Sequence, residues 1–326
     1  SILILVLPAI IIFLSNHDIK RNVNKFSCKY SDTKCQRVFL ENILEHDSVG
    51  SAIRILNELN SENKIKGCHE RAHEAGSFAF KHRLRVDKLG DDSKLLNLCS
   101  SGFIHGYLET AGIGSSVSEL IKMTLDICGN YEIGSKSEQD CVHGLGHSLF
   151  KEGSSVRKMV EVCKGLYSWS SSGSKDSKLL SEFNCASGYS MEMFINPKDK
   201  TEGLSSVSEI DSLCKGVDNW LCKVSFVRNI IGNNQLDENT LRNRGKELEE
   251  YCQTAPIEYR ELCQLQIGFG VTTFLGTKEN IDDLIGISNM VCHSANCQYG
   301  SIQLNILQGR GYSQDYIKKV CSSLKY

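Results

Sequence analysis

The sequence predicts an all-α protein in which disulfide bonds join a series of helical hairpins. Cysteines recur along the chain at the spacing of helix-pair repeats, and the segments that precede many of them have the periodicity of amphipathic helices. Only 3 prolines interrupt the 326 residues. The composition, 40% hydrophobic and 23% charged, is ordinary for a globular protein. A net charge of -2 offers no basic surface for phosphate backbones, so we expect no nucleic-acid partner.

The chain begins with an apolar run at residues 2–14, ILILVLPAIIIFL, which polar and charged residues follow. This run is shorter than the roughly 20 residues of a complete membrane span. The following FLSNHD lacks the small residues of a signal-peptide cleavage site. We therefore expect residues 1–22 to be an apolar helix that anchors the chain in the cell membrane by a single pass. A cleaved or simply buried segment is the alternative.

The 15 cysteines indicate an oxidising compartment, because this many thiols would be unusual in a reducing cytosol. Together with the apolar start of the chain, they place residues 23–326 on the extracytoplasmic side of the membrane. Fifteen is an odd number, so at least one thiol is unpaired, bonded to another molecule, or a metal ligand.

From Cys99 onward a unit recurs that opens with a cysteine before an apolar segment and closes with a cysteine after an amphipathic one. Successive openings are 42, 44, 37, 41 and 34 residues apart, which is the period of helix-pair repeats. One hairpin cannot bury its apolar face alone, so we expect an α-solenoid of about seven to eight stacked hairpins. The openings are Cys99, Cys141, Cys185, Cys222, Cys263 and Cys297, and the closings are Cys128, Cys163, Cys214, Cys252, Cys292 and Cys321.

The closing segments are predicted helices. In the segment that ends at Cys128, apolar residues recur three and four positions apart, and Ser115 or Ser116 can cap the N-terminus. These apolar residues are Val117, Leu120, Ile121, Leu125 and Ile127.

Each closing cysteine lies a short connection away from the next opening cysteine, so we expect these two to form a disulfide. Cys28 and Cys35 flank a similar short loop. Cys68 and Cys99 lack such partners and either bond each other or serve as thiolate ligands, and Cys321 is the expected leftover thiol. The expected pairs are Cys128 with Cys141, Cys163 with Cys185, Cys214 with Cys222, Cys252 with Cys263, and Cys292 with Cys297.

This cysteine placement, together with the CxxG string that opens the units at 99, 141, 185 and 297, resembles the cysteine-rich, tetratricopeptide-like repeat proteins. In that family disulfides link the second helix of one αα unit to the first helix of the next. The resemblance covers roughly residues 28–326. It implies an extracytoplasmic protein that binds proteins or peptides, and it offers no explanation for the histidines.

Histidines are concentrated in the first half of the chain. Aligned on their cysteines, the units at 99, 141 and 185 read CxxGxxH, CxxGxxH and CxxGxxM, so His105, His147 and Met191 occupy one repeat position. Equivalent positions of stacked hairpins lie side by side. The later units place Arg228, Phe269 and Gln303 there, so the repeat itself does not require histidine.

These residues predict a transition-metal site in the repeats at 68–195. The repeats at 196–326 are expected to carry no such site. HERAH at 69–73 matches HExxH, in which two imidazoles bind zinc and the glutamate, here Glu70, serves as general base. Zinc, copper and iron all suit histidine-rich ligation. The candidate ligands are His69, His73, His105, Glu109, His143, His147, Met191 and Glu192.

A different class of function fits the same chain. The histidines can be structural residues, in which case the protein is a scaffold or accessory subunit of a membrane complex that binds a partner protein on its concave face. We find no Walker loop, dinucleotide fingerprint or GxSxG elbow in the sequence.

Overall fold

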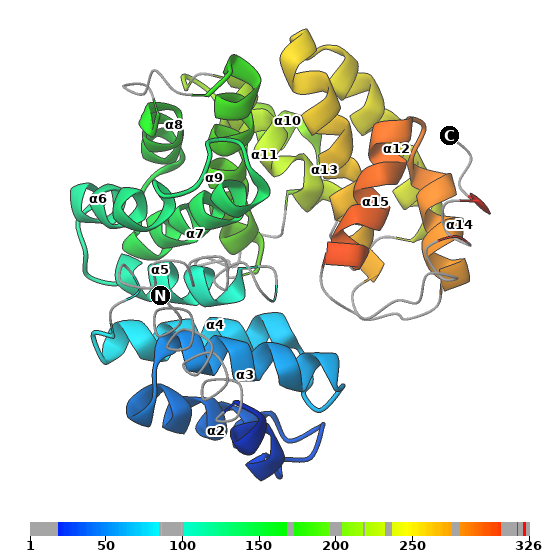
Figure 1. Ribbon diagram of the computed structural model, residues 1–326. Coiled ribbons are helices and arrows are strands. Elements are labelled where there is room, and N and C mark those ends of the chain that lie inside the picture. Colours follow the sequence, from blue (N-terminus) through cyan, green and yellow to red (C-terminus); the bar gives the residue numbers. More distant parts are fainter. Residues whose placement is uncertain are drawn as a thin grey trace, which may run out of the picture. The chain divides into compact units, whose positions relative to one another are not determined.

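All regular secondary structure is helical in the part of the chain that the structure, a computed structural model, describes (Figure 1). This confirms the predicted all-α fold class. The apolar run at 2–14 and Cys321 lie outside the described residues, and none of the described helices is both long and apolar enough to cross a membrane. The described residues are 19–84, 86, 99, 101–167, 173–195, 204–217, 219–231, 237–275, 281–307, 318 and 322–323.

The chain divides into two compact units, Ser1–Ala111 and Gly112–Tyr326. In the N-terminal unit, helices α2, α3 and α4 pack on one another. The side chain of Ser48 caps the start of α3 by accepting from the Ser51 N–H at 3.1 Å. The helices are α2 (Thr33–His46), α3 (Val49–Ser61), α4 (Cys68–Lys81) and α5 (Gly102–Gly112), whose last residue begins the second unit.

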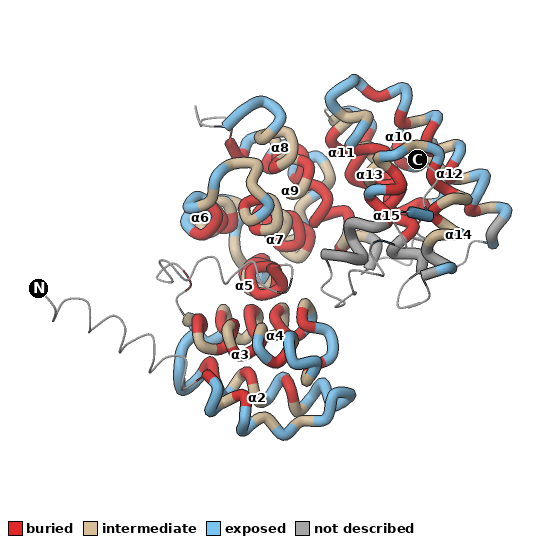
Figure 2. Tube along the Cα trace, turned by 45° about the vertical axis from the view of Figure 1, so that its right-hand side comes forward, coloured by how far each residue is buried: buried red, intermediate tan, exposed pale blue. Residues whose placement is uncertain are grey.

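In the C-terminal unit, the helices that open successive repeats pack against one another: α7 on α9, α9 on α11, α11 on α13, and α13 on α15. The closing helices α8 and α12 pack on α9 and α13. Buried residues follow α11 and α13 in Figure 2, which marks this row of opening helices as the core of the unit. The helices are α6 (Val117–Cys128), α7 (Lys136–Glu152), α8 (Val156–Gly165), α9 (Lys175–Ile195), α10 (Val207–Leu213), α11 (Asn219–Ile231), α12 (Glu238–Gln253), α13 (Ile257–Leu275), α14 (Ile281–Val291) and α15 (Ala295–Leu307).

The predicted closing helix before Cys128 is α6. Ser116 is its N-cap and forms a capping box with Glu119, because each side chain bonds the other residue's backbone N–H. Leu120 and Ile127 are buried as the apolar pattern predicts. Thr124, which the pattern did not include, is buried beside them.

Seven disulfides join described residues of the chain, and all five predicted closing-to-opening pairs are among them. Each of these five links the end of a closing helix to the next opening helix. The two N-terminal bridges also follow the expectation, including the pairing of Cys68 with Cys99 rather than their use as thiolate ligands. The bridges are Cys28–Cys35, Cys68–Cys99, Cys128–Cys141, Cys163–Cys185, Cys214–Cys222, Cys252–Cys263 and Cys292–Cys297.

Glycines let the opening helices approach at backbone distance. A Cβ on Gly188 of α9 would lie 2.1 Å from the His143 carbonyl of α7, and one on Gly146 would lie 2.0 Å from the Cys185 carbonyl of α9. Gly268 and Gly300 form the same reciprocal pair between α13 and α15. The glycine of the CxxG string is therefore the contact point at which one opening helix meets the helix before it.

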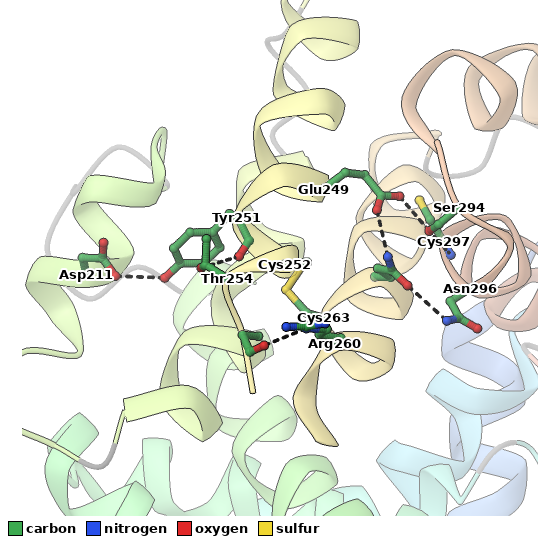
Figure 3. The surroundings of a disulfide bond; sticks show 12 residues. Asp211, Glu249, Tyr251, Cys252, Thr254, Arg260, Cys263, Ser294, Asn296 and Cys297 are labelled. Carbon is green, nitrogen blue, oxygen red and sulfur yellow. Dashed lines mark hydrogen bonds between the residues drawn. A yellow bond between two sulfur atoms is a disulfide. The ribbon is translucent and has the colours of Figure 1, made fainter. Parts of the chain in front are cut away.

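The bridge Cys252–Cys263 lies beside a buried carboxylate that organises the next repeat (Figure 3). Glu249 of α12 accepts from the Ser294 hydroxyl at 2.8 Å and from the Gln264 amide at 3.2 Å. It also accepts from the His293 backbone N–H at 3.3 Å. Because these donors lie on α13 and in the connection just before α15, Glu249 links α12 to both neighbouring segments.

A second buried carboxyl gives the fold a pH dependence that can be tested. Glu138 of α7 is fully buried and accepts from the Ser181 hydroxyl at 2.6 Å and from the Gly134 N–H at 3.0 Å. Burial raises the pKa of Glu138 above its ordinary value, although the hydrogen bonds from Ser181 and Gly134 act in the opposite direction. The folded state therefore holds the proton more tightly than the unfolded chain does. The resulting stabilisation is complete at acidic pH and is lost as pH rises through the folded pKa.

Replacing Glu138 with glutamine should therefore stabilise the protein more at pH 7 than at pH 4, because the amide removes the buried charge and still accepts hydrogen bonds. Denaturant unfolding of both proteins at the two pH values, with disulfides intact, measures the free energy of unfolding. An equal difference at both pH values would show that the carboxylate is not destabilising at neutral pH.

Candidate metal centre

The predicted ligands lie on four opening helices, divided between the two units. His69 and His73 lie on α4, and His105 and Glu109 lie on α5, all in the N-terminal unit. The C-terminal unit holds the other four, on α7 and α9: His143, His147, Met191 and Glu192.

In the C-terminal unit, His143 and His147 lie one turn apart on α7. The helix begins at the cap Ser135, which accepts from the Glu138 N–H, and ends at Gly153 in the left-handed conformation that glycine tolerates. Residues four apart project from one face, and the two ring centroids are 4.8 Å apart.

His143 has a fixed tautomer because its Nδ1 lies 3.0 Å from the Asn184 carbonyl oxygen of α9. A carbonyl oxygen can only accept, so Nδ1 carries the hydrogen and the neutral ring has its lone pair on Nε2. Burial lowers the pKa of His143 well below its ordinary value, and electrostatic interactions with His147 and Arg228 lower it further. The ring is therefore neutral at pH 7, the state that a metal ligand needs.

His147 is oriented by a carboxylate instead. Its Nδ1 lies 2.8 Å from Glu192 Oε1, and the two side chains are only 5% and 7% exposed. The other oxygen of Glu192 lies 2.9 Å from the Lys151 ammonium. Burial alone would raise the pKa of Glu192, but the hydrogen bonds and charges of His147 and Lys151 lower it to about 2. Glu192 is therefore an ionised acceptor, and Nδ1 of His147 carries the hydrogen.

In the N-terminal unit, His69 makes the contact that His143 makes in the other unit. Its Nδ1 lies 2.9 Å from the Cys99 carbonyl oxygen, so this nitrogen again carries the hydrogen. The His69 ring centroid lies 5.4 Å from that of His105 and 6.0 Å from that of His73. His73 Nε2 lies 2.9 Å from Glu109 Oε2. The unit thus brings together three imidazoles and a carboxylate.

Two of the predicted site residues, Glu70 and Met191, are more exposed than the buried pair His147 and Glu192. Glu70, the candidate base, is exposed, and its carboxylate lies over Gly67 at the N-terminus of α4, where a negative charge is favourable. Met191 is half-buried on α9 beside Glu192.

Sequence reasoning missed three groups around the imidazoles, namely the Lys151 ammonium on Glu192 and the backbone carbonyls of Asn184 and Cys99. Lys151 could have been found, because it lies four residues after His147 on the same helix face. Asn184 and Cys99 act through backbone carbonyls, which leave no trace in the side-chain pattern.

Within the C-terminal unit, His147 and Glu192 offer an imidazole and a carboxylate, two donor types of a metal site. Searches of protein-family models, curated proteins and solved structures found no match to this chain.

Proposed function

We propose that this protein binds a transition-metal ion through His143 and His147 of its C-terminal unit. The observation that carries the proposal is that each ring has an oxygen acceptor at Nδ1, the Asn184 carbonyl for one and Glu192 for the other. Histidines that bind metals almost always donate their second ring N–H to a carbonyl, a carboxylate or water. Both neutral rings thus have the tautomer whose lone pair lies on Nε2, the nitrogen that would bind the ion.

The spacing of the two rings supports the same proposal. With Zn–N distances of about 2.0–2.1 Å and tetrahedral angles, two imidazoles on one ion have centroids about 5 Å apart. The His143 and His147 centroids are 4.8 Å apart. We assign Glu192 an orienting role, because His147 and Lys151 engage its two oxygens, and we keep Met191 as a further ligand.

Zinc, copper and iron are the ions we propose, because imidazole suits all three. Met191 favours copper, whereas nearby carboxylates favour zinc or iron. Hydrolysis with Glu70 as general base remains part of the proposal only if the ion keeps an open coordination position.

Metal analysis of the purified full chain tests the proposal. The wild-type protein should contain a stoichiometric transition metal that the double variant His143→Ala/His147→Ala loses. His46→Ala, which removes an exposed imidazole from α2, should leave the metal content unchanged. Glu192→Gln should retain the fold and weaken metal affinity by about 10- to 100-fold, the usual effect of losing an outer-shell partner.

Circular dichroism and disulfide mapping of each variant establish that it folds. The proposal is wrong if the folded wild-type chain neither contains a transition metal nor takes one up from Zn²⁺ or Cu²⁺ solutions. It is also wrong if the double variant binds as much metal as the wild type.

The scaffold function is the second candidate, and one observation favours it. Four imidazoles already have protein partners: His69, His73, His143 and His147 each bond a backbone or side-chain oxygen. Such contacts also occur around purely structural histidines. In this reading the stacked hairpins form an α-solenoid, related to the tetratricopeptide-like repeat proteins, whose concave face binds a partner protein.

For either function, we propose that the protein lies on the extracytoplasmic side of the membrane. Seven disulfides suit an oxidising compartment. We further propose that the apolar run at residues 2–14 anchors the protein in the membrane by a single pass.

A further inference from the structure

The N-terminal unit repeats the packing that positions His143 in the C-terminal unit. A Cβ on Gly102 of α5 would lie 2.4 Å from the His69 carbonyl, just as one on Gly188 would lie 2.1 Å from the His143 carbonyl. In both places a backbone oxygen lies beside Nδ1 of the histidine, that of Cys99 just before α5 and that of Asn184 within α9. His69 is therefore the structural counterpart of His143, and His73, four residues later, is the counterpart of His147.

The N-terminal set differs from the C-terminal set in two ways. His73 uses Nε2 rather than Nδ1 to bond its carboxylate, Glu109. A third imidazole, His105, is buried on α5 with its ring 5.4 Å from that of His69. This is close to the spacing of about 5 Å that two imidazoles on one tetrahedral ion have. The repeat position that His105 occupies on α5 is occupied by Met191 on α9.

We propose that the N-terminal unit binds a transition-metal ion of its own, so that the chain holds two. His69 and His105 are the ligands, with Nε2 of His69 directed at the ion because its Nδ1 donates to Cys99. His73 is the third imidazole of the set, and Glu109 orients its ring. This inference goes beyond the proposed function, which requires one ion in the C-terminal unit.

Equilibrium dialysis of the full chain against Zn²⁺, followed by metal analysis, tests the inference. The wild-type protein should bind two equivalents. The variant His69→Gln/His105→Gln should bind one, because glutamine at 69 can still donate to the Cys99 carbonyl but is a poor zinc ligand. His143→Ala/His147→Ala should also bind one. His82→Ala is the matched control, since His82 lies at the end of α4 and stacks on Phe78 at 3.9 Å, and it should bind two.

The outcomes separate this inference from the proposed function. If the wild type binds one equivalent that only the α7 variant loses, the second ion does not exist and the proposed function stands. If either variant loses all bound zinc, the ligands serve a single linked site and the inference is wrong. If the α7 variant loses nothing and the glutamine variant loses one equivalent, the inference stands and the proposed function fails. If the wild type binds no zinc, both fail.

Discussion

Replacing Gly146 with alanine should destabilise the protein by about 3 kcal/mol or more, at the upper end of the cost of overpacking. In an unpacked helix the same change is stabilising by about 0.5–1 kcal/mol. The sign reverses here because the new Cβ would lie 2.0 Å from the Cys185 carbonyl oxygen and 2.6 Å from the Tyr189 nitrogen. Both atoms belong to the backbone of α9, so no side-chain rotation relieves the clash.

Gly286→Ala is the matched control, because Gly286 is exposed within α14 and has open space where its Cβ would be. This variant should be as stable as the wild type or slightly more stable. Denaturant unfolding with disulfides intact, in the presence of a chelator, compares the three proteins without a contribution from metal at the neighbouring His147. A Gly146→Ala protein as stable as the control would mean that α7 and α9 are not in backbone contact.

These glycines show how far the sequence alone predicts the fold. Cysteine spacing predicts the helices and the six bridges that close short connections, because a disulfide needs its partners close together and short connections leave few choices. The seventh bridge, Cys68–Cys99, spans 31 residues, and the spacing left it as one of two alternatives. The CxxG string shows that a glycine recurs at one repeat position. It does not show why, because the glycine is required by a backbone contact with a neighbouring helix. Where the string is absent, at Cys222 and Cys263, α11 and α13 use Gly270 instead, which packs against the Arg228 carbonyl.

The candidate site, like the fold, could be predicted from the sequence only in part. Aligning the repeats identifies His105 and His147 as special, because the later repeats do without histidine at that position. The alignment does not reveal tautomers, since the atoms that fix them at His69 and His143 are carbonyl oxygens of Cys99 and Asn184. Every residue type carries such an oxygen, so only the three-dimensional packing determines which one a histidine meets.

Removing the bridge Cys68–Cys99 by a double change to alanine should cost about 3–4 kcal/mol of unfolding free energy, from the chain entropy of its loop. The cysteines are 31 residues apart, whereas those of Cys292–Cys297 are 5 apart, for which the same relation gives about 2 kcal/mol. The matched variant Cys292→Ala/Cys297→Ala therefore serves as the control, and denaturant unfolding in chelator measures both.

Loss of Cys68–Cys99 should also lower the zinc affinity of the N-terminal histidines, whereas loss of Cys292–Cys297 should not. Cys68 directly precedes His69, and Cys99 supplies the carbonyl that holds the His69 ring, so the disulfide fixes both ends of this hydrogen bond. Without it, zinc affinity at the N-terminal unit should fall while the C-terminal unit keeps its ion. Equal losses of stability in the two cysteine variants would contradict the loop-entropy account. Unchanged zinc affinity would show that the packing of Gly102 against α4 is enough to hold His69.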